Sequence, residues 1–190
     1  FVGNYFYLPN QFWSHKNHFS VFKAIKILKN KGIEPLLICS GVLKDYRYEN
    51  NIYIDGLIKY ISENNLENNI RILGKIDYPD VLLFMKKSLS VINPSFFEGW
   101  SSTVEEAKSI GKKIILSDIA VHREQDPASG VYFDPKNEAD LSEILELEWF
   151  KGSSQTSDLI QEDAVKDLEN RTFEFGKNYL QIIRGIYDEY

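Results

Sequence analysis

Two carboxylates, Glu98 and Glu106, bracket a stretch rich in glycine and hydroxyl side chains. The apolar run 89–93 predicts a strand entering this stretch, and residues 103–110 predict a helix leaving it. A strand-to-helix junction offers free backbone N–H groups and the positive end of a helix dipole, which together suit a phosphate. We therefore predict an anion-binding turn made of Gly99, Trp100, Ser101, Ser102 and Thr103.

The two carboxylates suit hydroxyl groups, because an ionised carboxylate only accepts hydrogen bonds. A carboxylate beside a diphosphate would repel it, so we expect Glu106 to bind the hydroxyls of a ribose. Glu98 precedes the turn and can reach the hydroxyls of a sugar. Ser102 and Glu105 have a simpler structural interpretation, since they fit a capping box with Ser102 as the N-cap.

A lysine in the loop after the first predicted strand is the second candidate. A lysine ammonium is a mobile point charge that suits phosphate oxygens. By itself, Lys16 is better explained as a solvated surface lysine. Its position after a strand favours contact with a phosphate, because ligands of parallel sheets bind at the carboxyl ends of the strands.

The elements predicted around these residues alternate between strands and helices. Strands are predicted at 1–8, 35–39, 70–73, 88–93, 113–116 and 131–133, with helical patterns between them and a long final helix over 161–190, bent at Gly176. Parallel strands need crossover helices, so the alternation predicts an α/β fold with a Rossmann-like, doubly wound parallel sheet of about six strands. Gly41 and Gly74 follow two of these strands, either as turn residues or as points where the backbone approaches a nucleotide base.

Length and composition are those of one globular domain, 1–190. The net charge of -6 argues against a nucleic-acid-binding surface. The single Cys39 excludes an intrachain disulfide and suits a reducing cytosol. The three histidines lack a zinc-binding spacing and are interpreted as polar loop or cap residues, so no metal site is predicted. Because the chain starts inside a predicted strand without Met, we expect a piece of a longer protein.

The order of Pro94-Ser95, Glu98-Gly99, Glu106 and the segment 111–118 resembles the donor-binding half of the GT-B retaining glycosyltransferases of family 4. That family carries two glutamates separated by seven residues at this place. The resemblance covers nearly the whole chain. It implies a single nucleotide-sugar-binding domain, the C-terminal half of a GT-B fold, with the N-terminal acceptor domain absent.

The resemblance also assigns roles, with Glu98 on the donor sugar and Glu106 on the ribose. In the family an arginine stands five residues before the lysine, and both hold the diphosphate. Lys16 matches the lysine, but Gln11 stands in place of the arginine, so one positive charge is missing. The catalytic candidates are thus Lys16 and Glu98. The donor-binding candidates are Gln11, Gly74, Gly99, Trp100, Ser101, Ser102, Thr103 and Glu106.

The implied activity is transfer of a hexose from a UDP- or GDP-sugar to a glycan or lipid-linked acceptor, as in polysaccharide biosynthesis. No cofactor or metal is expected beyond the donor, and the isolated domain should transfer little or nothing. The expected partners are the nucleotide sugar, the missing N-terminal domain and the acceptor, without nucleic acid. The implied location is the cytoplasm, including the inner face of a membrane reached through the missing half.

Two alternatives remain open at this point. One is half of a GT-B nucleotide-sugar 2-epimerase, and the other is a nucleotide-binding module without catalysis, which Gln11 supports best.

The aromatic residues fall into two groups, core residues and loop residues. Phe6, Phe96, Phe97 and Tyr132 are predicted to pack the core, whereas Trp13 and Trp100 lie in loops, where they either anchor the loop or stack on a sugar. The apolar stripe of the last helix is expected to be exposed or self-associating if another domain is missing.

Overall fold

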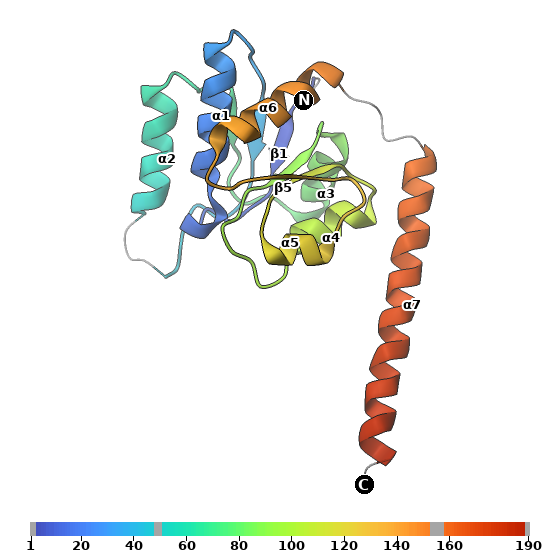
Figure 1. Ribbon diagram of the computed structural model, residues 1–190. Helices are drawn as coiled ribbons and strands as arrows, with labels where there is room; N and C mark the ends of the chain where they lie inside the picture. The colour runs from blue at the N-terminus through green and yellow to red at the C-terminus, as the bar shows by residue number, and fades with distance from the viewer. Residues whose placement is uncertain (1–2, 48–50, 153–157, 189–190) are drawn as a thin grey trace.

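A computed structural model describes residues 3–47, 51–152 and 158–188. Six strands form a single sheet in the order β3-β2-β1-β4-β5-β6 (Figure 1). They are β1 (Phe6–Leu8), β2 (Leu37–Cys39), β3 (Ile70–Ile72), β4 (Val91–Asn93), β5 (Ile114–Ser117) and β6 (Gly130–Phe133). All five pairings are parallel, which confirms the doubly wound sheet predicted from the alternation of strands and helices.

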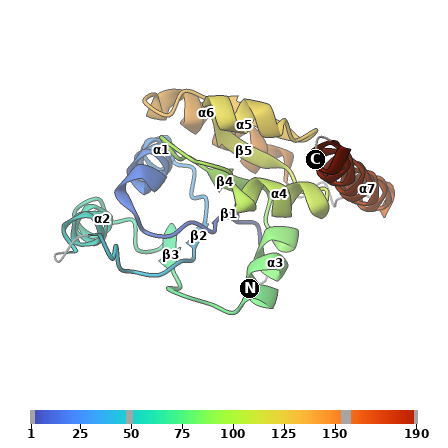
Figure 2. The same cartoon turned by 90° about the horizontal axis from the view of Figure 1, so that it is seen from below.

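Helices connect the strands and cover both faces of the sheet (Figure 2). They are the 3₁₀ helix η1 (Ser14–Lys16), α1 (His18–Asn30), α2 (Ile52–Glu63), α3 (Tyr78–Lys87), α4 (Ser102–Ser109), α5 (Ala120–Gln125), α6 (Glu138–Lys151) and α7 (Asp158–Asp188). One expectation about the start of the chain is wrong, since the first strand begins only at Phe6, with residues 1–2 outside the described part. At the other end, α7 continues through Gly176 as one helix.

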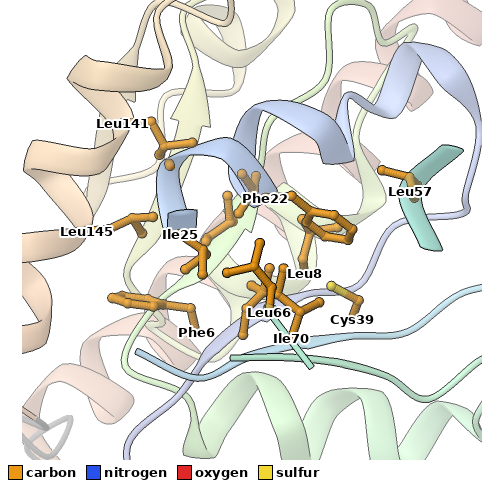
Figure 3. Close-up of a cluster of buried hydrophobic side chains, with 14 of the residues drawn as sticks. Phe6, Leu8, Phe22, Ile25, Cys39, Leu57, Leu66, Ile70, Leu141 and Leu145 are labelled. Carbon is orange, nitrogen blue, oxygen red and sulfur yellow. The ribbon is translucent and has the colours of Figure 1, made fainter. Parts of the chain in front are cut away.

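The larger core lies between the sheet and helices α1, α2 and α6 (Figure 3). Alternate strand residues such as Phe6 and Leu8 point to this side and meet Phe22 and Ile25 of α1. The residue between them, Tyr7, points to the opposite face and packs with α3 and α4. Because both faces are covered, the four inner strands β1, β2, β4 and β5 are buried along their whole length and lack the alternation of a half-exposed sheet.

Phe96 and Phe97 do not belong to either core, contrary to the sequence-based prediction. Their exposed fractions are 46% and 68%. Both follow β4 in the loop beyond its carboxyl end, where a side chain no longer projects onto a covered face of the sheet. Most of the apolar residues that the structure describes on α7 are exposed as well, as expected: Phe173, Phe175, Tyr179, Leu180, Ile182 and Ile186. No helix in the described ranges combines the length and apolar character needed to cross a membrane.

The loops that follow β1 and β2 approach each other closely at Gly41. Gly41 has a φ of +151°, and a Cβ added there would lie 2.4 Å from the carbonyl oxygen of Asn10. Its N–H donates to the carbonyl of Gly74 at 2.9 Å, which joins the loop after β3 to the same edge. Glycine is therefore required at position 41 by close backbone packing as well as by the turn.

Gly41→Ala should lower the free energy of unfolding by roughly 1–3 kcal/mol more than Gly32→Ala does. Gly32 is the matched control, because it also has a positive φ, +79°, but an added Cβ would meet nothing within 4 Å. Chemical denaturation of the two variants measures the difference. Equal losses of unfolding free energy in the two variants would show that close packing against Asn10 does not add to the cost of a side chain at position 41.

Lys112 lies at the opposite, amino-terminal edge of the sheet and is only 8% exposed. Its ammonium donates to the carbonyls of Lys86 and Ser88, at the end of α3. Burial lowers the pKa of Lys112 to about 8, from 10.5 for an exposed lysine. Between these values the unfolded chain binds more protons than the folded chain, so this lysine makes stability rise with pH there.

We expect Lys112→Met to abolish a stability gain of roughly 1–3 kcal/mol between pH 8 and pH 10.5. Denaturation at several pH values would measure it, with the exposed Lys87→Met as control. Burial raises the pKa of Tyr7 to about 12, and this opposing alkaline effect is common to all three chains. The prediction fails if the curves for the unmodified chain and Lys112→Met run parallel.

Candidate functional site

The candidate residues gather where the strand order reverses. Strand β1 is flanked by β2 on one side and by β4 on the other, with Tyr7 opposite Val91 in register. The helices that follow these strands, α1 and α4, pack on opposite faces of the sheet. The loops after β1 and β4 therefore diverge at their carboxyl ends, which is the usual ligand position in this fold.

Lys16 and Glu98 meet at this point from the two diverging loops. The Lys16 ammonium donates to both carboxylate oxygens of Glu98 at 2.7 Å. Their side chains are only 14% and 8% exposed, so the pair is largely withdrawn from solvent. Phe96 N–H also donates to the carbonyl of His15 at 2.8 Å, which holds η1 against the second loop. The predicted closeness of Lys16 to the turn before α4 is thus observed, but its charge already has an internal partner.

A buried asparagine at the end of β4 connects both loops to the start of α4. The side-chain oxygen of Asn93 accepts from Asn10 at 3.0 Å and from the Ser95 hydroxyl at 2.8 Å. Its amide nitrogen donates to the Ser101 hydroxyl at 2.8 Å. The Ser95 hydroxyl also lies 2.7 Å from Glu98, so the same network supports the ion pair. Buried polar networks with every member bonded make a site rigid.

The N-cap of α4 is Ser101, which corrects the predicted capping box of Ser102 and Glu105. The Ser101 hydroxyl accepts from the Val104 N–H, and Ser102 is the first helical residue. Glu105 turns away from the cap and accepts from Gln125 of α5 and Arg171 of α7. Partners distant in the chain decided this orientation, which a local motif could not predict.

The predicted anion-binding turn has fewer open amides than expected. The Ser101 N–H donates to the side-chain oxygen of Gln125 at 3.2 Å. Ser102 and Thr103 occupy the first turn, where N–H groups have no intrahelical acceptor, and no other described residue accepts from them. Gly99 does not have a left-handed φ, and a Cβ there would meet nothing within 4 Å. Trp100 is exposed.

Glu106 lies one turn further along α4 and faces the start of α3. Burial raises the pKa of its carboxyl, and a hydrogen bond with the Tyr78 hydroxyl partly offsets that rise. It is half-buried. Glu106 and Glu98 thus have different neighbours, Tyr78 for one and Lys16 for the other, as separate roles would require.

Gln11 and Gly74 lie in the neighbouring loops. The Gln11 side-chain oxygen accepts from the Val42 N–H at 2.7 Å, so it ties the loops after β1 and β2 together. Gly74 has a φ of +71° and its carbonyl accepts from Gly41, as expected of a turn residue. These contacts give both residues structural roles, and their predicted contacts with a donor remain predictions.

Trp13 is anchored within its loop. The Arg47 guanidinium lies 4.9 Å from the centre of its ring, and Tyr46 packs edge-on against it. Arg47 is in turn paired with Asp45 at 2.6 Å. A hollow of about 340 Å³ lies beside these residues. The contacts favour the anchoring interpretation of Trp13.

Two of the three histidines, His18 and His122, are buried and so differ from the polar loop or cap residues that were predicted, whereas His15 lies in the loop after β1. His18 stacks on Phe12 in the larger core, and burial lowers its pKa to about 3. His122 of α5 is buried as well and contacts Ser117. His15 is half-buried, and burial together with the charge of Lys16 lowers its pKa. The described ranges hold no group of three or more histidine, cysteine or acidic residues able to bind a metal ion.

Sequence reasoning missed four residues that build this site. Asn10 and Asn93 form the network between the loops, and Gln125 holds Ser101. Asn17, left-handed with a φ of +52°, donates to the carbonyls of Pro94 and Pro135. An asparagine ending an otherwise apolar buried strand was the available signal for Asn93. Nothing local distinguishes Gln125, whose partners come from α4.

Comparison with known proteins identifies the family. The model of the family described as glycosyl transferases group 1 matches residues 3–162. The chain is 24% identical over 135 residues to the O-antigen chain mannosyltransferase RfbU of Salmonella typhimurium, covering 71% of this chain and 35% of that protein. It is 26% identical over 176 residues to an uncharacterized glycosyltransferase of Methanocaldococcus jannaschii, covering 84% and 45%. The chain thus spans less than half of these relatives.

Solved structures share the same fold. HepE of Anabaena, crystallised in complex with UDP, superimposes with a TM-score of 0.76 at 16% identity, covering 97% of this chain and 50% of HepE. A glycosyltransferase of Rickettsia africae superimposes with a TM-score of 0.72 at 21% identity, covering 95% and 48%. The structural neighbours are GT-B glycosyltransferases, and the chain belongs to the glycosyl transferases group 1 family.

Proposed function

We propose that this chain is the donor-binding domain of a retaining family 4 glycosyltransferase that transfers a hexose from a UDP- or GDP-sugar. One observation carries the proposal: the Lys16 ammonium and the Glu98 carboxylate meet at the reversal of strand order, beside the N-terminal turn of α4. A cation, open amides and a hydrogen-bond acceptor at one place suit a diphosphate joined to a sugar. HepE, a neighbour in fold, was crystallised with UDP and with UDP-glucose.

The proposed chemistry is electrostatic. Lys16 and the amides of Ser102 and Thr103 hold the diphosphate and stabilise the negative charge that builds on it as the glycosidic bond breaks. Glu98 accepts hydrogen bonds from the sugar, and Glu106 from the ribose. A nucleoside diphosphate is a stable leaving group that needs no general acid, unlike the two-carboxylate arrangement of glycosidases. Front-side displacement assisted by the leaving diphosphate is the mechanism we propose.

Glu98 has two partners in succession in this scheme. In the structure it is bound to Lys16 through both oxygens. A diphosphate that recruits the ammonium must separate this pair, which leaves the carboxylate without its cation. The hydroxyls of a donor sugar can replace the lost bonds, whereas a free nucleoside diphosphate offers no such replacement. The ion pair therefore favours the complete donor over the product.

The acceptor and the second domain complete the proposal. The relatives are longer than this chain, and RfbU is an O-antigen chain mannosyltransferase, which supports a glycan or lipid-linked acceptor. We propose that an N-terminal domain supplies the acceptor site, that the enzyme works in the cytoplasm or at the inner face of a membrane, and that the isolated domain transfers little or nothing.

A nucleotide-binding module without catalysis is the second candidate. Gln11 is the observation that favours it, because its amide cannot neutralise a diphosphate and is instead used to fix Val42. Transfer by the full-length protein with an acceptor would decide for the transferase. Nucleotide binding without turnover would decide for the module.

Lys16→Ala should weaken binding of UDP or GDP by roughly 10- to 100-fold, since a hydrogen bond to a charged group contributes about 1.5–3 kcal/mol. Binding of the bare nucleoside should change little. Calorimetry measures the nucleotides and ligand-detected NMR the weaker nucleosides. Lys23→Ala is the control, because Lys23 forms an ion pair with Glu138 away from the site. Equal losses for nucleotide and nucleoside would refute a phosphate role for Lys16.

Glu98→Gln should act in the opposite direction on free UDP or GDP. Without the carboxylate, Lys16 is released, and affinity for the diphosphate should rise by roughly threefold to tenfold. The preference for the sugar nucleotide over the free nucleotide should fall. Titration with UDP and UDP-glucose, or with GDP and GDP-mannose, measures both effects, with Glu138→Gln as control. Weaker binding of the free nucleotide would contradict the competition between Glu98 and diphosphate.

A further inference from the structure

Gln125, at the end of α5, is 2% exposed, and its side chain bonds both the N–H and the carbonyl of Ser101. Its side-chain oxygen accepts from the Ser101 N–H at 3.2 Å, and its nitrogen donates to the Ser101 carbonyl at 2.9 Å. A glutamine amide carries a donor and an acceptor side by side, so it can pair with a peptide as a neighbouring strand would. Ser101 is therefore held from outside its own helix.

The Gln125 side-chain amide donates its second hydrogen to Glu105. Gln125 Nε2 lies 2.9 Å from one carboxylate oxygen of Glu105. The Lys108 ammonium donates to the backbone carbonyl of Gln125 at 2.7 Å. Both hydrogens of Nε2 thus have acceptors. A carboxylate at position 125 would face the Ser101 carbonyl and Glu105 without a hydrogen to donate. The site accordingly selects glutamine over glutamate by its hydrogen-bond pattern.

The other oxygen of Glu105 extends the network to the C-terminal helix. Arg171 of α7 donates to it at 2.7 Å and to Asp167, in its own helix, at 2.8 Å. Figure 2 shows α7 beside α4. Arg171 lies beyond residue 162, where the match to the family model ends. A segment outside the matched region is therefore joined by three successive contacts to the turn before α4.

We propose that Gln125 is a positioning residue for the diphosphate-binding turn, and that Glu105 and Arg171 make this turn sensitive to the position of α7. The proposal rests on the proposed function, since it names what aligns the amides of Ser102 and Thr103. Ser101 is the N-cap, so its backbone conformation sets the direction in which those two N–H groups point. Small displacements of aligned donors reduce electrostatic stabilisation strongly.

The network reaches the donor site without touching the donor. Among the described residues, the Gln125 side chain bonds the Ser101 backbone and Glu105, and Arg171 lies further away on α7. A change at Arg171 should therefore alter diphosphate binding through geometry and leave contacts with a base unchanged. This selectivity separates positioning of the turn from general stabilisation of the domain.

The test compares Arg171→Ala and Gln125→Glu with Lys177→Ala in the 190-residue chain. Lys177 is a matched control, since it pairs with Glu174 on the same helix. Arg171→Ala should weaken UDP binding about threefold and Gln125→Glu about tenfold or more, with uridine affinity unchanged in both. The amide resonances of Ser102 and Thr103 should shift in the Arg171→Ala variant without any nucleotide, and stay in place in Lys177→Ala.

If Gln125→Glu fails to fold, the result for Arg171→Ala alone tests the proposal. The proposal is overturned if Arg171→Ala shifts neither resonance, or if uridine is weakened as much as UDP. A chain that binds neither UDP nor GDP would refute the proposed function, while the amide resonances would still test the link between α7 and the turn. GDP replaces UDP in every arm if the unmodified chain prefers it.

Discussion

The position of β4 directly beside β1 is the constraint on which the rest of the structure depends. The chain leaves β1 toward one face of the sheet and leaves β4 toward the other, so the space between their loops is not filled by a connecting helix. Lys16 comes from the first loop and Glu98 from the second. Any ligand that lies across the strand reversal therefore contacts both loops.

The bond between Lys16 and Glu98 explains how this region stays ordered with its charges withdrawn from solvent. Each charge is the main partner of the other, and the Ser95 hydroxyl lies within hydrogen-bond distance of both Glu98 and Asn93, which share its single hydrogen. A buried ion is costly unless it is paired, so a ligand that takes one partner must also satisfy the other. A nucleotide sugar carries both an anion and hydroxyls, and in the proposed function it meets this requirement at one place.

The fold was largely predictable, and the details of the site were not. Strand and helix positions follow from local hydrophobic periodicity, so the strands predicted at 70–73 and 113–116 are observed within one residue of those bounds, at Ile70–Ile72 and Ile114–Ser117. Phe96 and Phe97 look like core residues in the sequence, but they lie beyond the end of β4 and are exposed. The cap of α4 shifted from Ser102 to Ser101 because Asn93 and Gln125 hold Ser101 from outside the helix.

The sequence alone determined the alternation of strands and helices, the parallel sheet, the two glutamates around a helix start and the lysine after the first strand. These features depend on residues close together in the chain. Only the tertiary structure decided that Lys16 is bound to Glu98 and that Arg171 reaches Ser101 through Glu105 and Gln125. Strand order brings these residues together, and hydrogen-bond partners distant in the chain leave no periodic signal in it.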